Sequence, residues 1–236
     1  MTRGYCCVAD RRARRGQASK VISMPQQCLT LVMSAGRRLL ILVLTLSLSA
    51  CGLPLLQPPA EQPTRNYLLE WHAGSVPLVE SPRRGSLLIS PVLSTPGFDS
   101  SDMAYMRKAH EIEYFAHHRW VDAPARMLEP LLVQAAERSG LFRSVVEAGN
   151  GADVDLRLDS RLIHLQQVCR LNPSELQLAL RVTLSEVSSA RVIATRTLSV
   201  NEAIVERNPY AGVEAANRAV DRLLSELQGF LLEQLK

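Results

Sequence analysis

The sequence predicts an α+β fold, a mostly antiparallel or mixed sheet with two main helices packed on one face. Apolar and polar residues alternate in three segments, near 153–159, 176–185 and 191–205, as in strands with one buried and one solvated face. Two further segments, from about 122 to 139 and from about 210 to 234, carry apolar stripes at helical spacing. Strands, a helix, more strands and a closing helix are typical of an α+β sandwich.

The elements before the long strands follow from local signals. In chain order, we expect short buried strands at 67–69 and 87–89, a loop at 94–102, a strand at 111–120, a helix from 122 to 139 and a strand at 142–146. Pro91 closes the second strand, because proline cannot donate to a sheet ladder. Asp122 followed by Pro124 is a helix N-cap signal, and Gly140 is a stop signal.

Charge is divided unevenly along the 236 residues. The whole chain has a net charge of +4, but positions 1–50 hold eight basic residues and one acidic residue, which leaves −3 for positions 51–236. If the first fifth is removed, a nucleic-acid partner loses its main support. A hydrophobic content of 47% with 21% charged residues excludes a disordered chain, and the length fits one ordinary domain.

The first fifth contains a targeting segment. Residues 39–50 lack any charge and follow Arg37 and Arg38. Twelve positions are too few to span a bilayer, which takes about 20, but they suit a secretory signal peptide. The segment ends Leu48-Ser49-Ala50-Cys51, which resembles the lipobox of bacterial lipoproteins. The alternative, a buried helix with an ordinary cysteine, is disfavoured because a proline-rich stretch follows at once.

The lipobox resemblance implies that Cys51 becomes the first mature residue and carries an S-diacylglycerol group and an N-acyl group such as palmitate. Such acyl chains hold a protein on a bilayer essentially permanently. Gly52 follows instead of aspartate, which by similarity to Gram-negative sorting favours the outer membrane, facing the periplasm. Cys169 is the other cysteine of the mature chain, and we expect it to be a small core residue without a disulfide partner.

These signals divide the chain into four parts. We expect residues 1–32 to be an upstream extension from a misassigned start or a part discarded with the signal, 33–50 the signal peptide, 51–65 a lipidated proline-rich tether, and 66–236 the folded domain. Proline-rich chain extends by about 3.1 Å per residue, so the tether can hold the domain up to ~40 Å from the bilayer.

The candidate chemistry of the domain is sparse. His117 and His118 are neighbours on a strand and point to opposite faces, so they cannot share a metal. Three aspartates between 153 and 159 share a face with Arg157 and Arg161, which favours cross-strand ion pairs over a calcium site. No nucleophile elbow, zinc-binding helix or phosphate-cradling glycine loop occurs. We therefore expect no enzyme activity, no metal and no cofactor.

The expected loop Pro96–Met106 is the most interesting surface candidate. It carries Phe98, Met103, Tyr105 and Met106, and such side chains are enriched at adaptable binding surfaces. Either these four residues contact a partner or a lipid, or they fold back onto the core.

Several segments together resemble a known family. Tyr67-Leu68-Leu69 follows the lipobox and tether, and Pro96-Gly97-Phe98-Asp99 precedes Met103-Ala104-Tyr105-Met106. Most diagnostic is an aromatic-rich stretch from Tyr114 to Pro124 containing Arg119-Trp120. These residues resemble the ABC-type transport auxiliary lipoproteins of the paraquat-inducible type, over about residues 66–235.

This resemblance implies an outer-membrane-anchored periplasmic subunit of a mammalian-cell-entry (MCE) type lipid transporter. Its partners would be an MCE-domain protein and, through it, an inner-membrane ABC permease and ATPase. Trp120 and Tyr114 would then be packing anchors, and assembly of several copies stays open. The alternative is an outer-membrane assembly or cell-wall accessory lipoprotein that activates an envelope enzyme.

Overall fold

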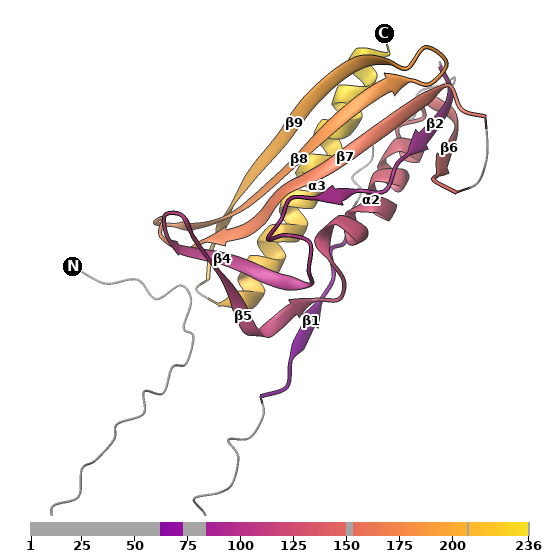
Figure 1. The fold of residues 1–236 in the computed structure, drawn as a ribbon. Coiled ribbons are helices and arrows are strands. Elements are labelled where there is room, and N and C mark those ends of the chain that lie inside the picture. The colour runs from indigo at the N-terminus through magenta and orange to yellow at the C-terminus, as the bar shows by residue number, and fades with distance from the viewer. Residues whose placement is uncertain (1–61, 73–83, 150–152, 207, 236) are drawn as a thin grey trace, which may run out of the picture. The chain divides into compact units, whose positions relative to one another are not determined.

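The computed structural model describes residues 62–72, 84–149, 153–206 and 208–235 (Figure 1). These residues form one nine-stranded sheet and two helices. Neither helix is long and apolar enough to cross a membrane. The predicted signal peptide, Cys51 and most of the tether lie outside the described residues.

The elements follow the predicted order, with two further strands. They are β1 (Arg65–Tyr67), β2 (Arg84–Ile89), β3 (Leu93–Ser94), β4 (Asp102–Lys108), β5 (Glu111–Trp120), α2 (Pro124–Arg138), β6 (Phe142–Glu147), β7 (Leu156–Val168), β8 (Ser174–Glu186), β9 (Arg191–Ile204) and α3 (Pro209–Gln234). The predicted α+β class with a mixed sheet and two helices is therefore confirmed.

Strand β7 is the centre of the sheet. The strands β2, β3 and β4 pair with it in parallel, one after another along one edge. Strand β8 pairs with its other edge in antiparallel register, and β9 pairs with β8 in the same way. Five of the eight pairings are parallel, but the three longest strands are joined by antiparallel pairings (Figure 1).

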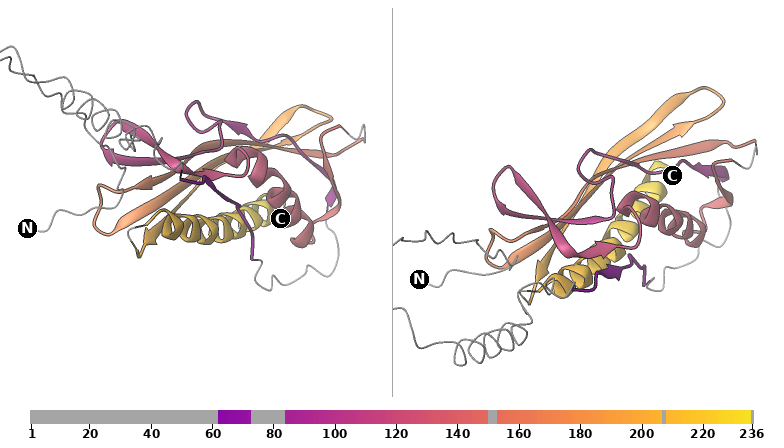
Figure 2. Two further views of the ribbon diagram at one scale, coloured as in Figure 1. Left: turned by 90° about the horizontal axis from the view of Figure 1, so that it is seen from below. Right: turned by 60° about the horizontal axis from the view of Figure 1, so that its bottom comes forward.

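The two faces of the sheet differ. Both helices lie on one face, as Figures 1 and 2 show together. Toward them point the alternate apolar residues of the long strands, with Leu162, Leu180 and Leu198 side by side in register and all buried. The opposite face, here called the outer face, carries the intervening polar residues.

Helix α3 supplies the largest part of the helical core. The predicted apolar stripe between 210 and 234 is buried at seven positions: Val213, Ala216, Val220, Leu223, Leu224, Leu227 and Leu231. One polar residue joins them, since the side chain of Gln228 donates a hydrogen bond of 2.9 Å to the main-chain oxygen of Ala135 in α2. The two helices are thus joined by apolar packing and by a buried hydrogen bond.

The start of helix α2 differs from the prediction. The N-cap residue is Ala123, not Asp122, and its own side chain makes no capping bond. The Asp122 carboxylate instead accepts from the Ala123 N–H at 2.7 Å and forms a bidentate ion pair with Arg126. These bonds hold the pKa of Asp122 down to about 2. At the other end, Gly140 has φ of +65°, a conformation in which glycine avoids the cost of a Cβ.

Two other predictions are wrong. The segment 102–106 is part of strand β4, not loop, and Met103, Ala104 and Tyr105 are buried in succession. Because three consecutive residues are buried, the sequence here lacks the alternation of apolar and polar residues by which a strand is recognised. Cys169 is disulfide-bonded, so the expectation of a free thiol is wrong for the full-length chain.

Candidate functional site

The chain reaches the domain through residues 62–72, here called the leading segment. After β1, its N–H groups at Glu70 and His72 donate to Asn217 Oδ1 (3.0 Å) and Asp221 Oδ1 (2.8 Å) of α3. Two extended residues rise by about 6.7 Å, and four helical residues by about 6 Å. The spacing of the two acceptors therefore matches that of the two donors.

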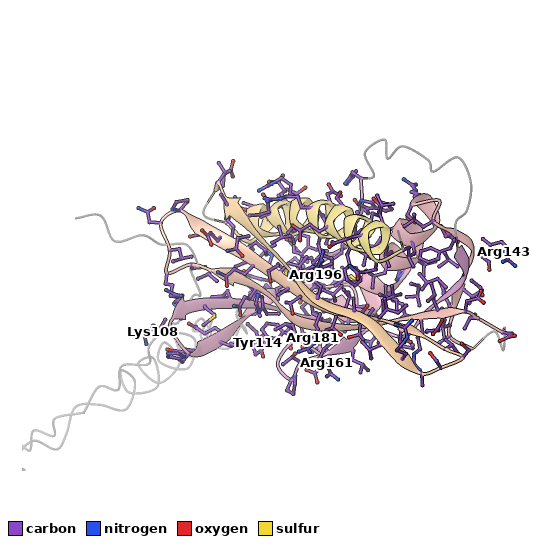
Figure 3. The ribbon with its side chains drawn as sticks, turned by 90° about the horizontal axis from the view of Figure 1, so that it is seen from above. Lys108, Tyr114, Arg143, Arg161, Arg181 and Arg196 are labelled. Atoms are coloured by element: carbon purple, nitrogen blue, oxygen red, sulfur yellow. The ribbon has the colours of Figure 1, made fainter. Side chains whose placement is uncertain are left out.

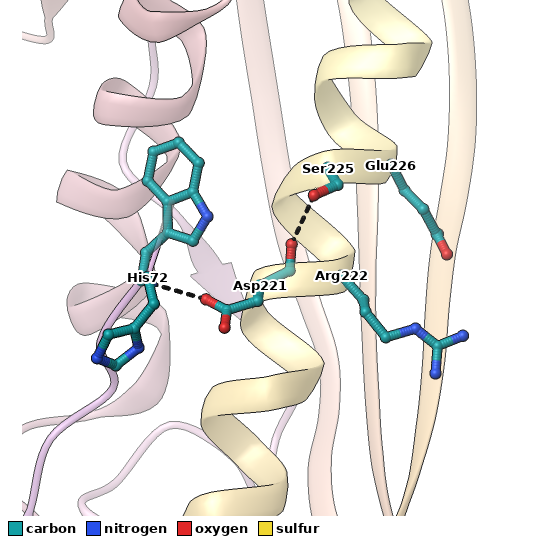
Figure 4. A pocket seen from close by; sticks show the side chains of 6 residues that line it. His72, Asp221, Arg222, Ser225 and Glu226 are labelled. Carbon is teal, nitrogen blue, oxygen red and sulfur yellow. Dashed lines mark hydrogen bonds between the residues drawn. The ribbon is translucent and has the colours of Figure 1, made fainter. Parts of the chain in front are cut away.

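A pocket of about 360 Å³ lies where the leading segment meets α3 (Figure 4). It is lined by Trp71, His72, Asp221, Arg222, Ser225 and Glu226. The Trp71 ring is also contacted by the guanidinium of Arg138 from α2, at 5.1 Å from the ring centroid. Acidic and basic side chains both line the pocket, and Asp221 already accepts the main-chain N–H of His72. The residues of this pocket therefore serve most clearly to hold the leading segment against α3.

Aromatic side chains fasten β1 to its neighbours. The Tyr67 hydroxyl lies 2.9 Å from His118 Nδ1, and the two rings stack with centroids 5.8 Å apart. Tyr210, at the start of α3, lies against Tyr67, and Phe115 lies against His118. Burial, with a smaller contribution from nearby positive charge, lowers the pKa of His118, so its imidazole is neutral at neutral pH.

The predicted surface candidates do not form one exposed group. Met103 and Tyr105 are 1% and 2% exposed and belong to the interior. Phe98 is partly buried, with its ring 6.4 Å from that of His164. Met106 is partly buried on the outer face, opposite Val168 of β7. Of the four, only Phe98 and Met106 reach the surface.

The sequence prediction missed two exposed residues on β5. Ile112 and Tyr114 are 41% and 43% exposed and point to the outer face, with Tyr114 opposite Ala104. The Tyr114 hydroxyl donates to the Gly97 carbonyl at 3.1 Å, which ties β5 to the loop that carries Phe98. The alternation of Ile112 and Tyr114 was visible in the sequence, but nothing there indicated which face was open.

We call Phe98, Met106, Ile112 and Tyr114 the outer apolar patch.

The family resemblance implied that Trp120 and Tyr114 are packing anchors. This role holds for Trp120, which is buried, whereas Tyr114 is partly exposed at the surface.

A hydrogen-bonded group on the opposite side of the β4–β5 hairpin supports this patch. The Tyr105 hydroxyl donates to Glu113 Oε2 at 3.0 Å, and Arg107 makes an ion pair with the same carboxylate. The hydrogen bond to Glu113 raises the pKa of Arg107 above its ordinary value. Tyr105 also lies against Phe115, with ring centroids 4.5 Å apart. The hairpin is therefore held in one conformation by side chains from both strands.

The acidic and histidine residues do not assemble into a metal centre. Within the described ranges, no three His, Cys, Asp or Glu side chains lie close enough to hold a metal ion. The predicted cross-strand ion pairs are wrong in detail. Arg157 pairs with Asp159 on its own strand at 2.8 Å, and Asp155 accepts the Ser86 N–H at 2.7 Å.

Comparison with known proteins is consistent with this arrangement. Residues 67–228 match the family described as the ABC-type transport auxiliary lipoprotein component. The fold is similar to the crystal structure of protein XCC0632 from Xanthomonas campestris, with a TM-score of 0.64 and 21% identity, covering 72% of this chain and 96% of that one. An uncharacterized protein gives a TM-score of 0.57 at 10% identity, covering 72% of this chain and 99% of the other. No curated protein matches the sequence.

Proposed function

The chain belongs to the family of ABC-type transport auxiliary lipoproteins, and from this premise we propose that it is a non-enzymatic subunit of an MCE-type intermembrane lipid transport system. It would stand at the outer membrane, facing the periplasm. Its partner would be an MCE-domain protein that leads to an ABC permease and ATPase at the inner membrane.

The observation that carries this proposal is the extent of the family match. It runs from Tyr67 in β1 to Gln228 in α3 and so includes nearly every described element. The leading segment, the hairpin β4–β5 and both helices all lie within it or begin beside it. The role proposed for the family therefore applies to this domain as a whole and not to one motif.

The anchor in this proposal is Cys51, modified by S-diacylglycerol and an N-acyl chain. Gly52 at the next position supports transfer to the outer membrane, and the proline-rich tether supplies reach. A Cys51→Ala variant should incorporate no labelled palmitate and leave the membrane fraction. Gly52→Asp should keep the acyl chains but move the protein to inner-membrane fractions of a density gradient. Labelled palmitate in the alanine variant would refute the anchor assignment.

The contact with the MCE partner is proposed at the outer apolar patch. Ile112 and Tyr114 are exposed there, Phe98 and Met106 border them, and Met103 and Tyr105 support the strand from the core. An exposed aromatic residue flanked by aliphatic ones is typical of the centre of a protein interface. The hairpin that carries Met106, Ile112 and Tyr114 is braced by the contacts of Glu113 with Tyr105 and Arg107, which reduces the entropy lost on binding.

Photo-crosslinking tests this contact directly. A photoreactive amino acid at Ile112 or Tyr114, in the lipidated protein in cells, should form an adduct with an MCE-domain protein. The matched control is position Thr195, which is exposed on the outer face of β9 away from the patch. Adducts from Thr195 but not from Tyr114 would contradict the patch. Capture of a cell-wall enzyme in place of an MCE protein would favour the accessory-lipoprotein alternative.

A further inference from the structure

Two arginines stand directly opposite each other on the outer face of the sheet. Arg161 of β7 is the register partner of Arg181 of β8, and both are exposed. Figure 3 shows them adjacent below the sheet, on the side away from α3. Arg196 of β9 lies on the helix side instead, over the ring of Phe230.

The other arginines of the three long strands are neutralised by acidic neighbours. These ion pairs are Arg157–Asp159, Arg191–Glu186 and Arg196–Glu233, at 2.8, 3.5 and 2.9 Å. Within the described residues, neither Arg161 nor Arg181 has an acidic group within 4.0 Å of its guanidinium. The nearest acid along β7, Asp159, is engaged by Arg157.

This arrangement carries a cost in the free protein. Like charges directly opposite in an antiparallel pair destabilise the sheet, while opposite charges stabilise it. The surroundings offer further hydrogen-bond donors, and the acid one row away, Asp159, is already paired with Arg157. Thr197 is the register partner of Arg181 on β9, and the hydroxyls of Thr183 and Thr195 lie one row away, 3.1 Å from each other.

We propose that Arg161 and Arg181 form a binding subsite for a phosphate group. A guanidinium binds oxyanions through two parallel N–H groups. Inorganic phosphate has four oxygens and a phosphodiester has two free ones, so either can lie between the two guanidiniums and accept hydrogen bonds from both. The phosphate can be free or part of a lipid headgroup. Leu93, the register partner of Arg161 on β3, is 55% exposed and places an apolar side chain beside the charged pair. The subsite goes beyond the proposed transport role and does not depend on it.

The test is calorimetric titration of the purified mature lipoprotein in non-ionic detergent at low ionic strength. The probes are inorganic phosphate and a short-chain phosphatidylglycerol, each compared with chloride at matched ionic strength. Arg161→Gln and Arg181→Gln should each weaken phosphate binding by about tenfold, as expected for loss of a charged hydrogen-bond pair. The matched control is Arg143→Gln, because Arg143 is exposed on β6 at the far end of the sheet (Figure 3).

The outcomes separate clearly. Tighter binding of the lipid than of inorganic phosphate assigns the subsite to a headgroup, and equal binding assigns it to phosphate itself. Equal effects of chloride, an equal loss in Arg143→Gln, or no binding by the wild type would overturn the proposal. Thermal melts without phosphate provide a second check. If the arginines served only the fold, Arg181→Gln would lower the melting temperature; relief of the like-charge contact predicts that it is unchanged or raised.

Discussion

The main-chain N–H of His72 donates a hydrogen bond of 2.8 Å to Oδ1 of Asp221, across 149 positions of sequence. With the bond from Glu70 to Asn217, it fixes the leading segment along α3. The last helix of the chain therefore fixes the course that residues 70–72 take across the domain.

Removal of both acceptors should release the leading segment. In Asn217→Ala with Asp221→Ala, two hydrogen bonds to main-chain N–H groups are lost, each contributing about 1 kcal/mol. We expect faster proteolysis and faster amide exchange at residues 65–72, with β7–β9 unchanged. Glu226→Ala is the control, since Glu226 lines the same pocket on α3 but makes no hydrogen bond to the leading segment among the described residues. Equal exchange rates in the double variant and the control would contradict the role of these side chains.

Two glycines of α3 predict opposite effects of alanine. A Cβ at Gly212 would lie 2.0 Å from Nε2 of Gln167, whose side chain is buried, whereas a Cβ at Gly229 would meet nothing within 4 Å. Gly212→Ala should lower the free energy of unfolding by about 1–3 kcal/mol, as overpacking does. Gly229→Ala should raise it by up to about 1 kcal/mol, because alanine is the better helix former. Denaturant unfolding measures both.

The pair Gly212→Ala with Gln167→Ala checks the cause. If the clash is with Gln167, the second substitution restores part of the lost stability. A double variant whose loss equals the sum of the single losses would mean that the close approach is not responsible.

Ser160 places a hydroxyl in the core of the sheet. Its Oγ is buried and makes no hydrogen bond among the residues that the structure describes. Such a group costs about 1–3 kcal/mol, so Ser160→Ala should leave stability unchanged or increase it. Ser139→Ala is the matched control and should lose about 1 kcal/mol, because its hydroxyl donates to Ala136 O at 2.6 Å. Loss of stability in Ser160→Ala equal to that in the control would show that the hydroxyl has a partner.

Stability should fall as the solution is acidified below about pH 6.5, the ordinary pKa of histidine. Burial lowers the pKa of His164, and burial together with Arg65 lowers that of His118. When the pKa is lower in the folded state, the unfolded chain takes up the proton at a higher pH than the folded protein does. The stabilisation that each neutral histidine gives the folded state is therefore complete above pH 6.5 and decreases as the pH falls toward the folded-state pKa.

Denaturant unfolding of His164→Gln at pH 7.5 and 5.5 should show a smaller pH dependence than the wild type. His117→Gln is the control, because that imidazole is exposed on β5. A wild-type pH dependence in His164→Gln would argue against burial as the cause.

The sequence was informative where burial alternated regularly. The large apolar residues of β8 recur at every second position from Leu176 to Leu184 and are buried, and the stripe of α3 repeats at helical spacing, so both were predicted with their buried faces. Strand β4 was missed because Met103, Ala104 and Tyr105 are buried in succession, between β5 on one side and β7 on the other. Of the outer apolar patch, the sequence indicated Phe98 and Met106 but not Ile112 and Tyr114, because the exposure of those two depends on which face of the sheet the helices leave uncovered.

Parallel pairing was the least predictable feature. Nothing in the local sequence of β2, β3 or β4 indicates that all three share one edge of β7. Arg161 and Arg181 are register partners because the pairing of β7 with β8 shifts by one residue between Leu162 and His164. Such shifts have no signature in a lone sequence, so the arginine pair became visible only in the fold.

The central position of β7 has a consequence for export. A chain that crosses a membrane from its N-terminus delivers β1 to β6 before β7, and Asn217 and Asp221 almost last. The earlier strands therefore have no complete sheet to join until most of the chain has emerged, and sequence-distant pairing of this kind is slow. During that interval the apolar strands are open to aggregation. A chaperone that protects the first half of the chain until α3 arrives would suit this topology.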